Sequence, residues 1–299
     1  MKPIEEIALT EIEAAARRLQ GVAVRTPLVR LNVESPLAEI YLKLENLQPI
    51  GSFKLRGAGN MAQGVAWNAR RLGVPSSAIV PENAPQTKLD AMERLGMRAI
   101  KVPYDRWWAV ITDHQYPGMN GVFIHPVADP AVIAGNGTIG LEILEDLPDV
   151  EAVVVPYGGG GLSCGIASAI RARQPRVNVF AAEVETAAPF AASLKAGSPE
   201  TVHHTPSFVD GIGGKSMLPE MWPLAKRVLA GSLVVSLREV ADAVRLLVER
   251  NHVVAEGAGA VPVAAALAGK TGKGKVVCVV SGGNIDVGKL KLILDGQVP

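Results

Sequence analysis

The sequence predicts an α/β protein in which mostly parallel sheets are covered by helices on both faces. Short β-rich runs alternate with helical patterns from one end of the chain to the other, which is typical of βαβ units. Residues 276–280 are continuously apolar, as expected of a strand buried on both faces. Glycine-rich turns follow two of the predicted strands. The 299 residues, 48% of them hydrophobic, suffice for one large unit or two modest domains.

Charge and composition exclude several classes of protein. The 30 basic and 29 acidic side chains give a formal net charge of +1, so the chain has no electrostatic footprint for nucleic acid or an anionic membrane. Cys164 and Cys278 cannot form a disulfide framework and have no metal-binding spacing. The start MKPIEEIALT lacks the apolar region of a signal peptide, and the most apolar stretch, 253–269, falls short of about 18 uninterrupted apolar residues. We therefore expect a cytoplasmic protein with neither a nucleic-acid nor a membrane partner.

The first half of the chain is predicted to alternate helices and strands. The run Thr10-Glu11-Ile12-Glu13 has the pattern of a capping box, so a helix is predicted from there to near Gly21. Pro85 falls in the first turn of a later predicted helix, where its missing N–H is not needed. After the first helix, the predicted elements are strand 40–44, helix 61–72, strand 77–80, helix 85–95, strand 98–102, helix 106–114, strand 122–125 and helix 140–147.

The second half repeats this alternation. The predicted strands are 152–155, 177–183 and 276–280, and the predicted helices are 161–173, 186–196, 220–230, 237–250 and the small-residue segment 259–268. No repeat with a period of about 20–50 residues is visible, which excludes a solenoid. No low-complexity linker divides the chain, so a second domain would be closely connected to the first.

Four consecutive glycines, Gly158 to Gly161, lie between a predicted buried strand and a predicted helix. Without Cβ atoms, the backbone N–H groups of such a loop can converge on an anion, and the helix dipole favours negative charge at the same place. We therefore interpret the loop as a phosphate cradle. The alternative is a tight strand-to-helix turn, although a turn seldom needs four glycines. No Gly-Lys-Ser/Thr follows, so the loop is not a Walker A motif.

Two further loops could carry chemistry. The run Ser-Gly-Gly-Asn at 281–284 directly follows an apolar strand, and the carboxyl ends of parallel strands are where open α/β sheets bind ligands. Taken alone, the same run could equally be a simple turn. Lys54 lies in a Gly-Ser-Phe-Lys loop after a predicted strand. Such a lysine is by base rate an ordinary surface residue, but beside a carbonyl cofactor it would be a Schiff-base nucleophile.

Together these loops resemble those of the fold-type II pyridoxal-phosphate (PLP) enzymes, in the branch of serine/threonine dehydratases and serine racemase. The similarity runs nearly from end to end, with the motifs in the family's order. They are KLENLQP at 43–49, GSFKLRGA at 51–58, Pro81-Glu82, APQTK at 84–88, His125-Pro126, Asp129-Pro130, AGNGT at 134–138, GGGGL at 158–162 and SGGN at 281–284. The resemblance implies two three-layer α/β/α domains with mostly parallel sheets, of the tryptophan synthase β-like kind. Residues 1–46 plus 133–299 would form a large cofactor-binding domain, and 47–132 a small, mobile substrate-binding domain.

The resemblance also implies roles for individual residues. Lys54 would carry the cofactor as a Schiff base and act as the proton-transfer base, Phe53 would pack on the cofactor face, and Asn60 would hydrogen-bond its phenolic oxygen. The neutral Ser281 would face the pyridine nitrogen, which weakens the electron sink and suits α,β-elimination better than transamination. The other implied cofactor-binding residues are Gly158, Gly159, Gly160, Gly161, Leu162, Gly211, Glu256 and Gly282. The implied substrate-binding residues are Ser52, Gly59, Asn60, Met61 and Gln63.

The implied activity is that of an ammonia-lyase, the PLP-dependent dehydration and deamination of a β-hydroxy amino acid such as L-threonine, L-serine or a 3-substituted serine. The substrate would take the place of Lys54 on the cofactor, and the freed amine would remove the α-proton. The β-hydroxyl would then leave, and hydrolysis would give a 2-oxo acid and ammonia. An amino-acid racemase of the serine/aspartate type, a β-replacement synthase and a catalytically weak PLP-fold binding protein are the alternatives. The family also favours a homodimer.

The chain departs from the family pattern around the lysine loop. Lys54 and Asn60 are only six residues apart, whereas the family places a helix and a strand, roughly twenty residues, between the two motifs. The small-domain sheet would thus lose a strand, unless a segment near 57–61 is missing from the sequence. Met61 stands where the family usually has His, and Gly57 where it has a substrate-binding serine. Without that serine, racemisation would lack its second acid/base.

The last departure concerns a divalent cation. A racemase-like cation site would use the Glu183 carboxylate, the Ala187 carbonyl and an acidic side chain at 189, but position 189 is proline. Hard cations require several oxygen ligands, so the sequence favours the absence of the cation. If a divalent cation does bind, Glu183 and Ala187 are the expected ligands.

Overall fold

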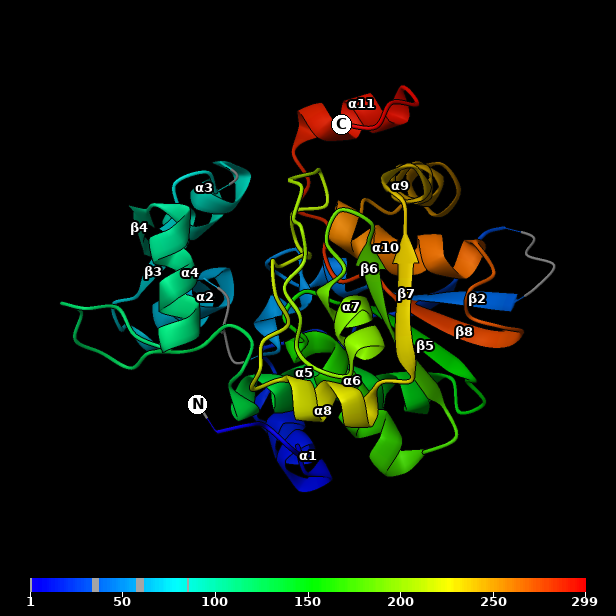
Figure 1. Ribbon diagram of the computed structural model, residues 1–299, viewed down its shortest axis with the longest axis horizontal. Helices are drawn as coiled ribbons and strands as arrows, with labels where there is room; N and C mark the ends of the chain where they lie inside the picture. The colour runs from blue at the N-terminus through cyan, green and yellow to red at the C-terminus, as the bar shows by residue number, and fades with distance from the viewer. Residues whose placement is uncertain (1, 34–37, 58–61, 85) are drawn as a thin grey trace.

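A computed structural model describes residues 2–33, 38–57, 62–84 and 86–299 (Figure 1). Within these residues the strands form two sheets, and the larger has the order β1-β2-β8-β5-β6-β7. In the larger sheet β1 is antiparallel to β2, and every other pair is parallel. Its strands are β1 (Leu28–Arg30), β2 (Ala38–Lys43), β5 (Ala152–Pro156), β6 (Asn178–Val184), β7 (Gly231–Val235) and β8 (Gly274–Val279). The α/β class with mostly parallel sheets is therefore confirmed.

Helices cover both faces of the larger sheet (Figure 1). One face carries α1 (Leu9–Arg18), α5 (Pro130–Asp146), α6 (Gly161–Arg173) and α8 (Trp222–Val228), and the other carries α9 (Leu237–Asn251) and α10 (Gly257–Leu267). Strand β5 contributes to both cores, because Val153 and Val155 pack with α5 and α6 whereas Val154 packs with α9 and α10. Successive side chains of a strand point to opposite faces, so one continuous apolar run fills both cores.

A second unit lies beside the larger sheet (Figure 1). Its strands β3 (Ser77–Pro81) and β4 (Arg98–Val102) are parallel, and its helices are α2 (Ala62–Leu72), α3 (Gln86–Arg94) and α4 (Tyr104–Asp113). Five buried side chains from α2, β3, α3 and the turn before β4 form a separate core, made of Ala66, Val80, Leu89, Met92 and Met97, whereas Ile111 of α4 belongs to the core beside α5 and α6. All these elements fall within residues 47–132, and the six strands of the larger sheet fall outside that segment.

Two predicted element boundaries are wrong at the start of helices. Helix α1 begins at Leu9 with Ala8 as its N-cap, because the Glu11 carboxylate accepts the Ala8 N–H at 3.3 Å, so the capping box does not start at Thr10. Helix α5 begins at Pro130 rather than at 140, with Asp129 accepting two N–H groups of its first turn. Glycines at 135, 137 and 140 hid this start, since glycine lowers helix propensity. They are needed because the backbone of α5 approaches the backbone of Arg56 at Gly135 and that of α6 at Gly137 and Gly140.

One predicted strand is absent, and three elements were missed. Residues 122–125 form no ladder, and Val122 is 91% exposed, because this β-branched run has no partner strand. The missed β1 and β7 lie at the two edges of the larger sheet and are only partly buried, so their hydrophobic signal is weak. The third missed element is α11 (Val287–Leu294), which follows β8. Helix α7 (Pro189–Ala196), which follows β6, lies within the predicted helix 186–196. In the described part of the chain, no helix is both long and apolar enough to cross a bilayer.

Candidate active site

Three loops follow neighbouring strands of the larger sheet and lie together at the carboxyl ends of those strands. Strands β2, β8 and β5 are parallel neighbours, so the loops after them leave the sheet on the same side. These loops carry Lys54, the glycine run at 158–161 and Ser281. The structure therefore brings together the three motifs on which the sequence interpretation rests.

The Ser281 turn holds the lysine loop from one side. Lys54 lies in the short 3-10 helix η2 (Phe53–Leu55), and the first N–H of η2 donates to the Ser281 carbonyl at 3.0 Å. Ser52 and Gly282 pair as an isolated bridge. Ser281 and Ser52 are both almost fully buried. A neutral hydroxyl residue is thus fixed next to the lysine, at the carboxyl end of β8.

The turn before the lysine loop depends on a glycine. Gly51 has a φ of +71°, a conformation that L side chains rarely adopt. A Cβ on Gly51 would also lie 2.7 Å from the Asn284 Oδ1. The Asn284 side-chain amide donates to the Ile50 carbonyl at 3.1 Å, and the Gly283 N–H donates to the Gly51 carbonyl at 3.0 Å. These bonds hold the lysine loop against the turn after β8.

The glycine run forms the turn between β5 and α6. Gly160 has a φ of +99° and is the N-cap of α6, and no side chain caps that helix. A Cβ on Gly159 would lie 2.7 Å from Val127 Cγ1, and one on Gly161 would lie 2.9 Å from the Val127 carbonyl oxygen. Packing therefore accounts for these two glycines. The uncapped first turn of a 13-residue helix leaves backbone donors for an anion at the same place.

Glu256 lies between two further glycines of the site. Its Oε1 would be 2.6 Å from a Cβ on Gly282 and 3.4 Å from a Cβ on Gly211. The Glu256 N–H donates to the Gly282 carbonyl at 3.0 Å, which fixes the start of α10. Gly158 faces the same wall, since its Cβ would lie 3.5 Å from Ile212 Cα. Glycine at 282 thus lets the backbone pack closely against this carboxylate.

Three buried polar atoms around the lysine loop have no hydrogen-bond partner among the described residues. They are the Ser52 Oγ, the Glu256 Oε2 and the Asn136 Oδ1. A buried polar atom without a partner costs about 1–3 kcal/mol, so native structures rarely keep one without a reason. A bound polar ligand would supply the missing partners.

Several predicted site residues fall outside this description. Gly59, Asn60 and Met61 lie outside the described residues. Gln63 belongs to α2, but its side chain is also outside what the structure describes. Leu162 is buried in the first turn of α6. The position of the substrate loop is therefore still a prediction.

The residues proposed for a cation do not fit one. Both oxygens of the buried Glu183 carboxylate accept protein donors: Oε1 accepts the Phe190 N–H at 2.9 Å, and Oε2 accepts the Ala191 N–H at 2.8 Å and the Ser232 hydroxyl at 2.6 Å. Burial raises the pKa of Glu183. The carboxylate therefore caps helix α7, whose first residue is Pro189. A hard cation would have to displace these donors without gaining an oxygen at position 189.

We expect catalysis to be independent of divalent cations. Treatment with a chelator, followed by dialysis, should leave the turnover rate within about twofold of the untreated enzyme. The measurement is the initial rate of product release with chelator and with added magnesium. A loss of about fivefold or more that magnesium restores would contradict this prediction and show that catalysis needs a divalent cation.

A second cluster of ligand-type side chains was not predicted. His114, His125 and Glu220 place one potential ligand atom each within 4.8 Å of one another. The two imidazole rings are stacked, with centroids 4.0 Å apart. The lone pairs of their nitrogens lie in the planes of the rings, so stacked rings do not direct them at one common ion. Both nitrogens of His125 are occupied, because Nδ1 accepts the Ala128 N–H at 2.7 Å and Nε2 lies 3.0 Å from the Ile111 carbonyl. Burial and the neighbouring His114 lower the pKa of His125 to about 4. The cluster is a packing contact rather than a metal site.

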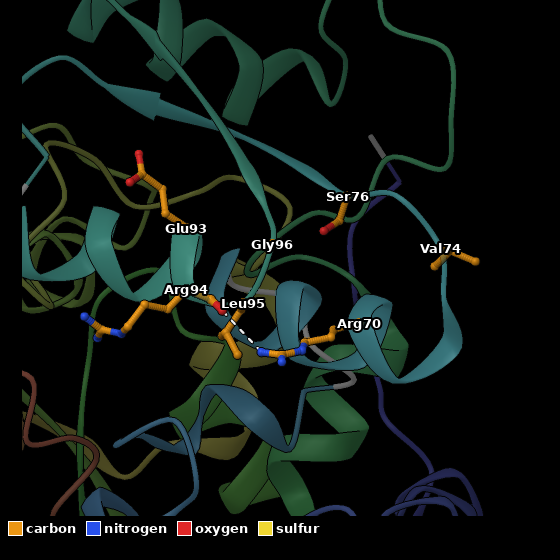
Figure 2. Close-up of a pocket in the computed structure, with 7 residues that line it drawn as sticks. All are labelled: Arg70, Val74, Ser76, Glu93, Arg94, Leu95 and Gly96. Carbon is orange, nitrogen blue, oxygen red and sulfur yellow. Dashed lines mark hydrogen bonds between the residues drawn. The ribbon is translucent and has the colours of Figure 1, made fainter.

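A surface cavity of about 320 Å³ lies in the second unit, away from the lysine loop. Figure 2 shows its walls, which come from the end of α2, the approach to β3 and the end of α3. Arg70 Nη1 donates to the Arg94 carbonyl at 3.2 Å. The cavity contains none of the buried atoms without partners. The polar groups that could act on a substrate are therefore at the lysine loop and not here.

The fold and the site together define a class of protein. A lysine on one loop, an uncapped helix start on the second and a buried serine on the third are typical of an α/β enzyme that binds a phosphorylated cofactor covalently. The chain belongs to the family described as pyridoxal-phosphate dependent enzymes, whose model matches residues 57–282.

Relatives with known activities cover nearly the whole chain. An L-threonine ammonia-lyase from Thermotoga maritima is 42% identical over 316 residues, which span 97% of this chain and 78% of that protein. A catabolic L-threonine dehydratase from Escherichia coli K12 is 35% identical and is matched over 96% of each chain. Among solved structures, maize serine racemase has a TM-score of 0.84 at 27% identity, with 96% of each chain covered. The processed form of a threonine deaminase from Solanum lycopersicum has a TM-score of 0.83 at 28% identity, covering 96% of this chain and 86% of that one.

The relatives contain positions that this chain lacks. The alignment with the Thermotoga maritima enzyme runs over 316 residues, more than the 299 of the whole chain, so gaps must fall in this chain. This agrees with the predicted shortfall of about one helix and one strand. The predicted place of the shortfall, near 57–61, includes residues 58–61, which lie outside the described residues.

The site fits pyridoxal phosphate. The uncapped start of α6 offers backbone donors for a phosphate, and the orphaned Ser52 Oγ and Glu256 Oε2 lie beside the loop of the only lysine in motif 51–58. At Gly211 and Gly282 the protein packs so closely that a Cβ would lie 2.8 Å from the Ala258 Cβ and 2.6 Å from the Glu256 Oε1, so both positions require glycine.

Proposed function

We propose that this chain is an ammonia-lyase that converts a small β-hydroxy amino acid, with L-threonine as the leading candidate, into a 2-oxo acid and ammonia. The names of the Thermotoga maritima and Escherichia coli relatives support threonine as the substrate. Amino-acid racemisation is the alternative activity, and it is supported by the serine racemase among the structural relatives.

The observation that carries the proposal is the position of Ser281 against the lysine loop. The Phe53 N–H donates to the Ser281 carbonyl, so the residue that follows β8 beside the lysine loop is a serine, with a neutral side chain, and not an aspartate or glutamate. A neutral partner for a pyridine nitrogen leaves the nitrogen unprotonated. That favours loss of a β-substituent over transamination, which needs a stronger electron sink.

Each part of the site would have a separate task. Pyridoxal phosphate, when bound, supplies an aldehyde that links to amines and a conjugated ring that withdraws electrons from the adjacent carbon. The first turn of α6 and the run Gly158–Gly161 would hold the phosphate. The Lys54 amine would take the proton from the α carbon of the substrate. The Ser52 hydroxyl, which is buried and has no hydrogen-bond partner among the described residues, would donate to the substrate carboxylate.

Product analysis tests this function directly. Incubation of the cofactor-loaded enzyme with L-threonine or L-serine should release 2-oxo acid and ammonia in equal amounts, because elimination produces one of each. The measurement is coupled detection of the oxo acid together with chiral chromatography of the remaining amino acid. D-serine as the main product would favour the racemase, and a substituted alanine in the presence of a nucleophile would favour a β-replacement synthase.

Three broader expectations belong to the same proposal. Residues 47–132 would form a small substrate-binding domain that moves on the rest of the chain, which the separate core of α2, β3 and α3 supports. The enzyme would be a homodimer. It would act in the cytoplasm, and its near-zero net charge supports the absence of nucleic-acid partners.

A further inference from the structure

A cluster of buried charges lies directly behind the lysine loop. Its members, here called the Arg56 cluster, are Lys43, Glu45, Arg56 and Glu142. The side chains of Lys43 and Glu45 are fully buried, that of Arg56 is 2% exposed and that of Glu142 is 14% exposed. Charged side chains are almost never buried to this extent unless they are paired. None of the roles assigned above uses this cluster.

The Arg56 guanidinium joins two carboxylates by paired hydrogen bonds. Nε and Nη2 donate to the two oxygens of Glu45, both at 2.8 Å. Nη1 and Nη2 donate to the two oxygens of Glu142, at 2.6 and 2.8 Å. Nη1 also donates to the Thr138 hydroxyl at 3.2 Å, and Nη2 to the Val24 carbonyl at 3.1 Å. Only the planar fork of an arginine can make both pairs at once.

The cluster connects the lysine loop to rigid parts of the fold. Glu45 lies in the 3-10 helix η1 (Glu45–Leu47), two residues after the end of β2, and Glu142 lies in α5. Arg56 is the C-cap of η2, and its N–H donates to the Phe53 carbonyl at 2.8 Å. Its carbonyl oxygen lies so close to Gly135 of α5 that no Cβ could be placed there. The three residues of η2 are thus held at the N-terminal end by the Ser281 carbonyl and at the C-terminal end by Arg56.

Stability alone does not explain such a cluster. The cost of removing charges from water roughly cancels the attraction of a buried ion pair, so apolar side chains of the same size would stabilise the fold as well. What paired carboxylates provide is one fixed geometry. The lysine loop has glycines at both ends, Gly51 and Gly57, and glycine gives a backbone its greatest conformational freedom, so a fixed anchor next to Lys54 restricts the loop to one conformation. A displacement of about 1 Å of a reacting group can lower a rate by about 100-fold.

We propose that Arg56 is a positioning residue for Lys54. Its bonds to Glu45 and Glu142 fix η2 so that the Lys54 amine meets the α carbon of the substrate. This inference rests on the proposed PLP-dependent elimination, since it assigns the task of Lys54 from that reaction.

The test compares Arg56→Lys with Arg25→Lys. Arg25 also pairs with two carboxylates of α5, Glu145 and Asp146, at 2.5 Å each, but its side chain is 51% exposed and lies outside the loop. Arg56→Lys keeps the charge and loses the paired geometry. We expect a fall in kcat of about tenfold or more with KM nearly unchanged. We also expect the pH at which the visible band of the bound cofactor titrates to shift by about half a unit or more. Arg25→Lys should match the wild type in both measurements.

Each outcome decides the proposal. A kcat within about twofold of the wild type and an unshifted titration for Arg56→Lys would overturn it. A fall in kcat only in proportion to the cofactor lost would assign a structural role and overturn it as well. If Arg56→Lys does not fold, Glu142→Gln, which keeps the shape and removes one charge, is judged by the same two criteria. If the wild type releases no 2-oxo acid, the proposed function fails, and the titration of the cofactor band still decides the role of Arg56.

Discussion

Replacing Lys54 by alanine is expected to abolish 2-oxo acid release while the fold is retained. In the proposed mechanism, the change would remove both the covalent attachment of the cofactor and the base that moves the α-proton. Proton transfer by a positioned side chain alone contributes about 10²–10⁴-fold, so we expect a loss of about 10³-fold or more. The measurement is the initial rate of oxo acid release. Borohydride treatment followed by intact-protein mass spectrometry should add the mass of the cofactor to the wild type and not to the variant.

A matched lysine serves as the control for this experiment. Lys195 lies in the last turn of α7, is exposed and touches no part of the site. Lys195→Ala should therefore keep the wild-type rate and the wild-type mass shift. Retention of more than about a tenth of the activity by Lys54→Ala, or a mass shift in that variant, would remove Lys54 from its assigned role.

Replacing Gly135 by alanine is expected to have the largest effect on stability. A Cβ at this position would overlap the carbonyl oxygen of Arg56 and lie 3.0 Å from its carbonyl carbon. Both atoms belong to backbone, so no side-chain rotation relieves the overlap, and α5 must move away from the lysine loop. Overpacking of this kind costs about 1–3 kcal/mol and sometimes more, and we expect the upper end of that range. Denaturant unfolding measures the loss, and the activity should fall with it.

Gly288→Ala is the control for the added methyl group. Gly288 lies in α11 with no heavy atom within 4 Å of a Cβ built on it. Since alanine is the better helix former, this variant should keep the wild-type stability or gain up to about 1 kcal/mol. If Gly135→Ala and Gly288→Ala unfold at the same denaturant concentration, the close approach of α5 to the lysine loop is not a constraint in solution.

Sequence patterns predicted elements well where local signals mark both ends. The bounds of α6 and β4 were predicted to the residue. A glycine run precedes α6 and basic residues fill its last turn, while turn residues bound β4. Helix α5 began ten residues too late in the prediction, because glycines needed for packing against other backbones lower the local helix signal. Packing, rather than propensity, determines that start.

The sequence predicted the three loops that form the site, but it did not predict the distant side chains that hold those loops in place. Lys54, the glycine run and Ser281 each follow a recognisable strand, and parallel strands gather their carboxyl ends at one edge. The partners of Arg56 carry no such signal, since Glu142 is 86 residues away in the sequence. The contact between His114 and Glu220 joins residues 106 apart. The hydrophobic periodicity of a segment predicts which of its faces is buried. It does not predict which distant side chain contacts that face.

The place of β8 in the sheet has a consequence for how the enzyme acquires its cofactor. Strand β8 is the last strand of the described chain, yet it lies between β2 and β5 and carries the turn that holds the lysine loop. Until β8 is inserted, the segment with the nucleophilic lysine and the segment that would bind the phosphate have no strand to join them. During synthesis, which proceeds from the N-terminus, the lysine loop and the glycine run are therefore brought together only after the ribosome has made most of the protein. With Lys54 in its proposed role, capture of the cofactor would be a late event, coupled to completion of the sheet.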